Sequence, residues 1–185
     1  MKNLIVYEDN NILICNKPVG MASQSERSFD VDLLSKVLTY RTEKGEAAYA
    51  AIINRLDKPV GGVMLFSRSS AVTGKLTGLI ARHEMEKEYL AILRGRPEKD
   101  EDTLTDLLFH DSTKNKSFVV QRERKGVREA RLSYRVLGYN EQEGLTLVKV
   151  RLHTGRTHQI RVQFSHRKLP LLGDIRYGSK ADCSP

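Results

Sequence analysis

The sequence predicts an α+β fold in which a mixed, mostly antiparallel sheet is flanked by helices. Short segments that alternate apolar and polar residues occur along the whole chain, as in half-buried strands. Between them, three segments repeat apolar residues at helical spacing. The chain has 185 residues and a hydrophobic content of 39%, enough for one core but not comfortably for two full domains. We therefore expect residues 1–185 to form a single domain.

A hairpin is expected at the amino terminus. Two short apolar runs, Leu4–Tyr7 and Ile12–Cys15, are separated by the polar residues 8–11, a composition typical of strand, turn and strand. The segment Asn16–Gly20, with one proline and one glycine, then ends the second strand.

The first helix should follow Ser28 or Asp30, either of which is a suitable N-cap. The strands Ala50–Asn54 and Gly62–Arg68 come next, and a second helix starts at about Ser69. The apolar positions that predict the two helices are Val31, Leu34, Val37 and Leu38, and then Val72, Leu76, Leu79 and Ile80.

In the second half, Glu86–Arg94 alternates and predicts a strand with Lys87 and Tyr89 on one side. Residues 100–116 stay unassigned apart from a polar loop at Asp111–Lys116, and Gln121–Arg131 is expected to be a charged connection. Two further strands surround Leu132, Tyr134 and Val136, and Val148, Val150 and Leu152. A last helix is expected from Thr157, with Ile160 and Phe164 facing the core and Arg161 one face away.

Charge favours a polyanionic partner. The formal net charge is +8, and between Leu145 and Lys180 eight cations face one acid, Asp174. Cys15 and Cys183 have no metal-type spacing, so neither a zinc site nor a disulfide framework is expected. No apolar run reaches bilayer length, and we expect a soluble cytoplasmic protein.

Asp57 is the first candidate for chemistry, because it lies on a turn between two apolar segments. Pro59 restricts the backbone, while Gly61 and Gly62 permit angles closed to other residues. An ordinary turn acid explains this segment alone equally well. Tyr89, on a strand, and Arg156 and Arg161, near a strand-to-helix turn, supply complementary groups.

Five motifs stand out in order along the chain. One is Asn54-Arg55-Leu56-Asp57-Lys58-Pro59-Val60-Gly61-Gly62. The other four are Asn16–Gly20, Lys87–Ala91, Thr154–Val162 and Leu171–Gly178. Together they resemble the RluA-type RNA pseudouridine synthases, whose catalytic signature is His-Arg-Leu-Asp-x-x-Thr-Ser-Gly. The resemblance covers residues 4–178 and implies the catalytic-domain fold of that family.

Two departures accompany this resemblance. Asn54 replaces the usual His, and Val60-Gly61 replaces Thr-Ser, so we expect the hydrogen bonds around the turn to be rearranged or absent. Relatives usually carry further strands after the Leu-Gly-Asp segment, whereas this chain ends at Pro185. The expectation is a single catalytic domain that lacks those strands and has no S4-like domain before it.

The resemblance implies isomerisation of uridine to pseudouridine in structured RNA, without metal or organic cofactor. Asp57 would attack C1′ of the ribose or remove a ribose proton. Arg156 would be the cation that keeps Asp57 ionised, with Arg161 in reserve. Tyr89 would stack on the base and help to remove the C5 proton.

Substrate binding is assigned to four residues by the same resemblance. Arg55 would help to extrude the nucleotide, and Leu172, or equally Leu171, would pack under the base. Arg161 and His158 complete this set. His158 could also suggest a metal site with His153 and His166, but the neighbouring cations argue against a divalent ion. The basic residues expected to hold phosphates are Arg122, Arg124, Lys125, Arg128 and Arg131.

Two alternative functions remain open. The replacements at Asn54, Val60 and Gly61 are compatible with a catalytically inactive RNA-binding protein on the same fold. A glycoside hydrolase needs two carboxylates at a set distance, and only Asp57 stands out. Ribosomal and transfer RNA are both candidate substrates, and we expect a monomer without an obligate protein partner.

Overall fold

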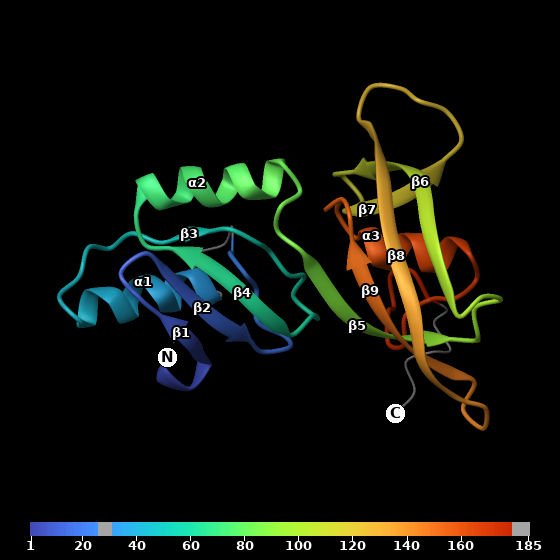
Figure 1. The fold of residues 1–185 in the computed structure, drawn as a ribbon, viewed down its shortest axis with the longest axis horizontal. Coiled ribbons are helices and arrows are strands. Elements are labelled where there is room, and N and C mark those ends of the chain that lie inside the picture. The colour runs from blue at the N-terminus through green and yellow to red at the C-terminus, as the bar shows by residue number, and fades with distance from the viewer. Residues whose placement is uncertain (26–30, 179–185) are drawn as a thin grey trace. The chain divides into compact units, whose positions relative to one another are not determined.

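The computed structural model describes residues 1–25 and 31–178, and the chain divides into two compact units, Met1–Glu84 and Met85 onward (Figure 1). The predicted α+β class is confirmed, because each unit combines antiparallel strands with helix. The strands form two sheets, not the one sheet that was expected. The assignment of the chain to a single domain stays a prediction.

The first unit contains a four-stranded sheet in the order β1-β2-β4-β3, and its neighbouring strands are antiparallel (Figure 1). The predicted strand Ala50–Asn54 is reduced to two residues; the Ile53 N–H still donates to the Leu65 carbonyl at 2.9 Å, but Asn54 pairs with β4 through its side chain. The elements are a 3₁₀ turn η1 (Lys2–Leu4), β1 (Ile5–Glu8), β2 (Ile12–Lys17), α1 (Leu33–Glu43), β3 (Ala51–Ile52), β4 (Gly62–Ser67) and α2 (Ser70–Ala81).

The core of this unit lies between α1 and one face of the sheet. Leu13 pairs with Phe66 and Cys15 with Met64 across β2 and β4, so alternate residues face the same side. Their fully buried side chains pack against Leu33 and Val37 of α1. Burial raises the pKa of the Cys15 thiol to about 12, which keeps it in the unreactive thiol form.

The N-cap of α1 differs from the prediction. Asp32 caps the helix by accepting a hydrogen bond from the Ser35 N–H at 2.7 Å, and its second oxygen accepts one from the Ser25 N–H at 2.8 Å. The predicted caps, Ser28 and Asp30, lie outside the described residues. Asp32 takes the role because its carboxylate satisfies donors on both sides of the helix start.

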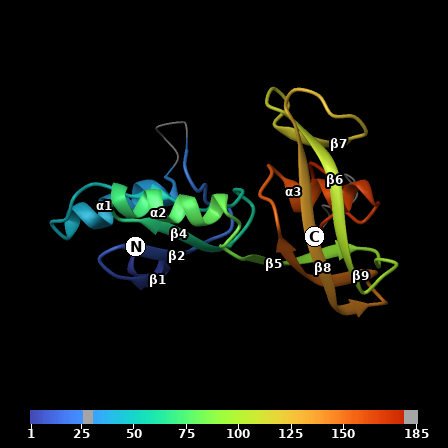
Figure 2. The same ribbon diagram turned by 45° about the horizontal axis from the view of Figure 1, so that its top comes forward.

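The second unit contains a five-stranded antiparallel sheet in the order β5-β9-β8-β6-β7 (Figure 2). The strand predicted at Glu86–Arg94 is confirmed almost to its ends. The expected charged connection Gln121–Arg131 is wrong from Val127 onward, because β8 begins there. The elements are β5 (Lys87–Arg94), β6 (Glu101–Asp111), β7 (Lys116–Val120), β8 (Val127–Asn140), β9 (Leu145–Leu152) and α3 (Gln159–His166).

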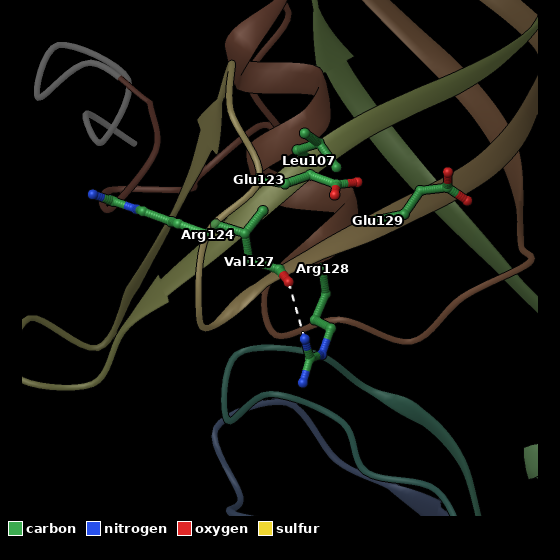
Figure 3. Close-up of a pocket in the computed structure, with 6 residues that line it drawn as sticks. All are labelled: Leu107, Glu123, Arg124, Val127, Arg128 and Glu129. Carbon is green, nitrogen blue, oxygen red and sulfur yellow. Dashed lines mark hydrogen bonds between the residues drawn. The ribbon is translucent and has the colours of Figure 1, made fainter.

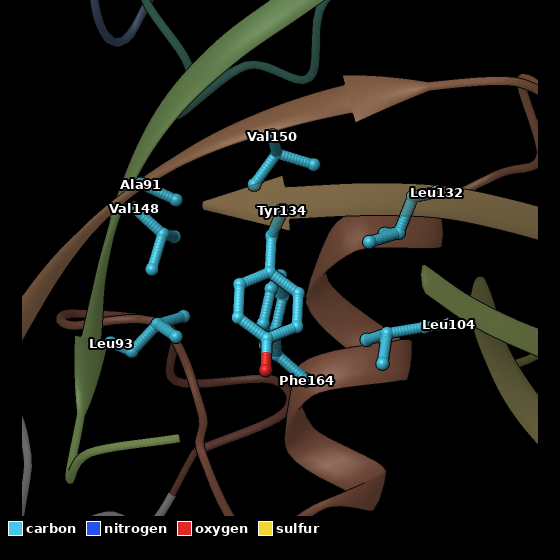
Figure 4. Close-up of a cluster of buried hydrophobic side chains, with 8 residues drawn as sticks. All are labelled: Ala91, Leu93, Leu104, Leu132, Tyr134, Val148, Val150 and Phe164. Atoms are coloured by element: carbon cyan, nitrogen blue, oxygen red, sulfur yellow. The ribbon is translucent and has the colours of Figure 1, made fainter. Parts of the chain in front are cut away.

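The core of the second unit lies between α3 and the inner face of this sheet (Figure 4). Phe164 of α3 is fully buried, as predicted, and its ring meets that of Tyr134 edge to face at a centroid distance of 5.4 Å. The helix begins at Gln159, two residues after the predicted start at Thr157, because His158 has a left-handed backbone with φ of 55°. The other buried residues of this cluster are Ala91, Leu93, Leu104, Leu132, Val148 and Val150.

Candidate active site

The Asp57 turn is held in place from both sides. Ser23, which is buried, donates its hydroxyl to the Leu56 carbonyl at 2.6 Å and accepts from the Leu56 N–H at 3.1 Å. On the other side, the Val60 N–H donates to the Asp57 carbonyl at 2.9 Å and closes the turn. The Asp57 side chain is half-buried between these contacts, so the position of the carboxylate is restricted.

The segment after β2 supports the same turn. The Gly20 N–H donates to the Lys58 carbonyl at 2.9 Å. Lys17 has no exposed surface, and its ammonium donates to the carbonyls of Met21 at 2.6 Å, Pro18 at 3.0 Å and Lys58 at 3.3 Å. Burial lowers the pKa of Lys17, while the charge of Asp57 acts in the opposite direction. A buried ammonium therefore lies within electrostatic reach of the candidate carboxylate.

Asn54 joins the turn to β4. Its side-chain amide donates to the Val63 carbonyl at 3.0 Å, and its side-chain oxygen accepts from the Leu65 N–H at 2.7 Å. The amide thus makes the two hydrogen bonds that a strand residue would make through its backbone. The expected rearrangement of hydrogen bonds at this position is therefore a specific pair of contacts to β4.

Gly61, part of the other departure from the motif, and Gly62, which matches it, shape the end of the turn. A Cβ atom at Gly61 would lie 3.1 Å from Val19 Cγ2 and 3.4 Å from the Lys17 carbonyl oxygen. Gly62 has φ of 136°, which side-chain-bearing residues rarely adopt. The missing side chain at Gly61 lets the Asp57 turn approach the segment after β2 closely.

The second unit presents Tyr89 and Arg156. Tyr89 is half-buried on β5, on the same face as Ala91, and it packs against the core. The exposed Arg156 donates from Nε to the Glu129 carbonyl at 2.8 Å, which restricts the orientation of its guanidinium group. Asp57 belongs to the first unit, as does Arg55, which is exposed and lies two residues before it.

Gln159 organises the turn that carries Arg156. Its side-chain oxygen accepts from the Arg156 N–H at 2.9 Å and from the Thr154 hydroxyl at 2.8 Å. Its amide nitrogen donates to the Arg131 carbonyl at 3.1 Å. Sequence reasoning missed Gln159, Ser23 and Lys17 as site residues. Lys17 and Gln159 lie within two of the matched motifs, and this could have marked them as site residues. Ser23 lies outside the motifs, and nothing in the sequence pointed to it.

Arg161 and His158 contact the segment that follows α3. Arg161 pairs with Asp174 through Nε at 2.7 Å and a second nitrogen at 2.8 Å, and both side chains are largely buried. Burial acts to raise the pKa of Asp174, but the hydrogen bonds and charge of Arg161 outweigh it, and the pKa is lowered. His158 Nδ1 lies 2.9 Å from the Tyr177 hydroxyl.

Leu171 and Leu172 are now distinguished by exposure. Leu171 packs against the core of the second unit. Leu172 is 40% exposed, and its N–H donates to the Ile92 carbonyl at 2.8 Å. Leu172 is therefore the more exposed of the two.

The described residues show neither a metal-type cluster nor a membrane-spanning helix. Residues 1–25 and 31–178 contain no cluster of three or more His, Cys, Asp or Glu side chains suited to a metal ion. His153 hydrogen-bonds to the Ser133 hydroxyl at 2.7 Å, and burial together with Arg131 and Arg151 lowers its pKa. In this part of the chain no helix has the length and apolar character needed to cross a membrane.

A surface hollow of about 440 Å³ lies next to the first residues of β8 in the second unit (Figure 3). Figure 3 shows Arg128 donating to the Val127 carbonyl, at 3.2 Å. Arg124 lies over the ring of Phe109 with its guanidinium carbon 4.8 Å from the centroid. The lining mixes two Arg with two Glu and includes none of the predicted catalytic residues.

Comparison with known proteins identifies the family. Residues 11–166 match the family described as RNA pseudouridylate synthase. An uncharacterized RNA pseudouridine synthase of Aquifex aeolicus is 33% identical over 185 residues, which cover 98% of this chain and 58% of that protein. Ribosomal large subunit pseudouridine synthase D of Yersinia pestis is 33% identical over 177 residues, covering 95% of this chain and 53% of that protein. The chain spans a little over half the length of these relatives.

Solved structures show the same fold. Human RNA Pseudouridylate Synthase Domain Containing 4 superposes with a TM-score of 0.81 at 22% identity, covering 100% of this chain and 72% of that one. Human RNA Pseudouridylate Synthase Domain Containing 1 gives 0.78 at 24% identity, covering 97% and 71%. The predicted fold is thereby confirmed, and with the match over residues 11–166 the chain belongs to the RNA pseudouridylate synthase family.

Proposed function

We propose that the protein is an RNA pseudouridine synthase with Asp57 as its catalytic carboxylate. The observation that carries this proposal is the Asp57 turn, which Ser23 and the Gly20 N–H fix on both sides next to the buried Lys17 ammonium. A carboxylate restricted in this way suits a step that demands alignment with one ribose atom. Family membership supports the same assignment.

In the proposed reaction, the bond between C1′ and N1 of a uridine breaks and a bond between C1′ and C5 forms. Asp57 acts on the ribose, either by attack on C1′ or by removal of a ribose proton. The base then rotates and rejoins through C5, the C5 proton is finally released to water, and N1 takes up a proton from water. Reactant and product have the same atoms, so no oxidant, reductant or co-substrate is required.

Each remaining site residue has a proposed part. Arg156 is the partner of the Asp57 carboxylate, a role for which its guanidinium geometry and permanent charge are suited. Tyr89 stacks on the base and assists removal of the C5 proton. Arg55 aids extrusion of the nucleotide, and the exposed Leu172 packs under the base.

For Arg161 and His158 we propose an indirect part in substrate binding. Their contacts to Asp174 and Tyr177 hold the segment that carries Leu172 against α3. The other cation of the predicted pair, Arg156, has no carboxylate partner among the described residues of its own unit, which supports its choice over Arg161 as the partner of Asp57.

The proposed substrate is ribosomal RNA, with transfer RNA as the second candidate, and the proposed compartment is the cytoplasm. Curated relatives named as ribosomal large subunit pseudouridine synthases support the first choice. The net charge of +8 suits a polyanion. We propose that the protein works as a monomer, without an obligate protein partner.

The alternative, an inactive RNA-binding protein, rests on the replacements around Asp57. The hydrogen bonds of Asn54 to β4 and the close approach at Gly61 show a turn that remains ordered with these residues. An ordered turn is compatible with catalysis, so the replacements do not by themselves argue for an inactive protein.

Nucleoside chromatography tests the function and the substrate together. Ribosomal and transfer RNA transcripts are incubated with the protein, digested to nucleosides and separated, because pseudouridine and uridine share one mass but differ in retention. We expect a pseudouridine peak from ribosomal RNA. RNA that is bound but yields only uridine would support the inactive binder instead.

A further inference from the structure

Lys87 lies on the inner face of the second unit, next to the turn that carries Arg156. It pairs with Leu152 across β5 and β9, and its side chain is on the same face as Tyr89, two residues further on. Its Nζ lies 3.4 Å from the position that a Cβ atom would take on Gly155. The Lys87 ammonium therefore reaches the residue directly before Arg156.

The two cations are close enough to repel each other. Burial, and after it the charge of Arg156, lowers the pKa of Lys87. The hydrogen bond from Arg156 Nε to the Glu129 carbonyl restrains the guanidinium group beside it. Among the described residues of the second unit, neither Lys87 nor Arg156 forms an ion pair with a carboxylate.

The opposite face of the same sheet is arranged differently. Lys149 pairs with Glu88 at 2.8 Å, and Arg151 pairs with Glu86. Cations on that outer face are thus compensated within the protein, whereas the inner face next to Tyr89 keeps two adjacent positive charges. Adjacent uncompensated cations form a ready site for anions.

We propose that Lys87 binds a backbone phosphate of the nucleotide that Tyr89 receives. This inference rests on the proposed function, in which the Asp57 carboxylate is the anion for Arg156. A second anion is then needed for Lys87, and a phosphate adjoins every nucleotide of RNA. An ammonium on a flexible stem is a common phosphate ligand in proteins.

The test compares Lys87→Gln with Lys149→Gln, which removes the same charge from the other face of the sheet. RNA binding is measured over a range of salt concentrations for both variants and the wild type, with a ribosomal RNA transcript as probe. For Lys87→Gln we expect the slope of log affinity against log salt to shrink by about 0.7 to 0.9, the value for one phosphate contact. Lys149→Gln should keep the wild-type slope.

Lys87→Arg separates a charge effect from a folding defect, because it keeps the positive charge and should restore the slope. A second measurement uses RNA with one neutral methylphosphonate linkage beside the modified uridine. This linkage should weaken binding of the wild type and leave the binding of Lys87→Gln unchanged.

Two results would overturn the inference: an unchanged salt slope in Lys87→Gln, or equal sensitivity of both proteins to the neutral linkage. If Lys87 instead serves Asp57, Lys87→Gln should alter the pH profile of turnover and keep the slope. Tritium release from RNA labelled at uridine C5 is recorded on the same samples. Its absence in the wild type would contradict the proposed function, while the binding slopes still decide the role of Lys87.

Discussion

At the scale of the residue, side chains that replace backbone hydrogen bonds determine the position of Asp57. Ser23 satisfies both polar groups of the Leu56 backbone, and Asn54 pairs with β4 through its amide. The turn residues predicted Asp57 as the candidate catalytic acid, and this assignment stays a prediction. The sequence did not reveal the partners of Asn54, because they depend on the register of β4 and not on neighbouring residues.

Replacing Asn54 with Ala should destabilise the protein. Both hydrogen bonds to β4 are lost, and we expect the free energy of unfolding to fall by about 1 to 2 kcal/mol. Urea denaturation measures the change, with Asn3→Ala at an exposed position as control. Equal stability of the two variants would show that the Asn54 contacts do not support the turn.

At the scale of the element, one carboxylate binds several groups of the segment after α3. Asp174 receives two hydrogen bonds from Arg161 and further ones from the N–H groups of Arg176 and Tyr177. The sequence marked Asp174 only as the lone acid among eight cations. That isolation was a usable signal, since a carboxylate in such surroundings tends to be paired.

We predict that Asp174→Asn lowers the free energy of unfolding by about 3 kcal/mol at neutral pH, because it leaves Arg161 largely buried without its counter-charge. Chemical denaturation gives the value. Asp100→Asn, which affects an exposed pair with Arg96, should change it little.

The same variant gives a pH prediction. The pKa of Asp174 is lowered in the folded protein from 3.8, so its contribution is complete above that value and disappears as pH falls through the folded-state pKa. The stability difference between wild type and Asp174→Asn should therefore shrink on acidification. A difference that stays constant down to the most acid conditions would contradict the ion pair.

Element boundaries followed the sequence where apolar residues alternate plainly. The strand predicted at Glu86–Arg94 is observed at Lys87–Arg94, and the alternate residues Ala91 and Leu93 are buried in the core. The start of β8 was missed because Arg128, Glu129 and Arg131 are exposed, and Ala130 is the buried residue between them. Pairing with β6 makes this charged segment a strand, and no local pattern encodes that pairing.

At the scale of the whole molecule, formal charge overstates the charge available to RNA. On the outer face of the second sheet, Lys149 and Arg151 are paired with Glu88 and Glu86. The loop between β7 and β8 is exposed throughout and carries Arg122, Arg124 and Lys125. The sequence predicted a basic protein, but the division of its strands between two sheets and the pairing of its charges required the structure.

Changing the three loop cations to Gln should weaken RNA binding in a salt-dependent way. If all three contact single-stranded phosphates, the slope of log affinity against log salt should shrink by about 2. The control changes Arg135, Lys149 and Arg151 to Gln, which removes equal charge from paired positions. A larger effect of the control would place the RNA on the outer face instead.

The central claim, that Asp57 performs the chemistry, is tested most directly by tritium release from RNA labelled at C5 of uridine. The wild type, Asp57→Asn and the exposed control Asp100→Asn are compared on ribosomal and transfer RNA, with RNA binding measured in parallel. We predict release by the wild type and by Asp100→Asn, and none by Asp57→Asn although it still binds RNA. Release by Asp57→Asn at the wild-type rate would contradict the assignment of Asp57 as the catalytic carboxylate.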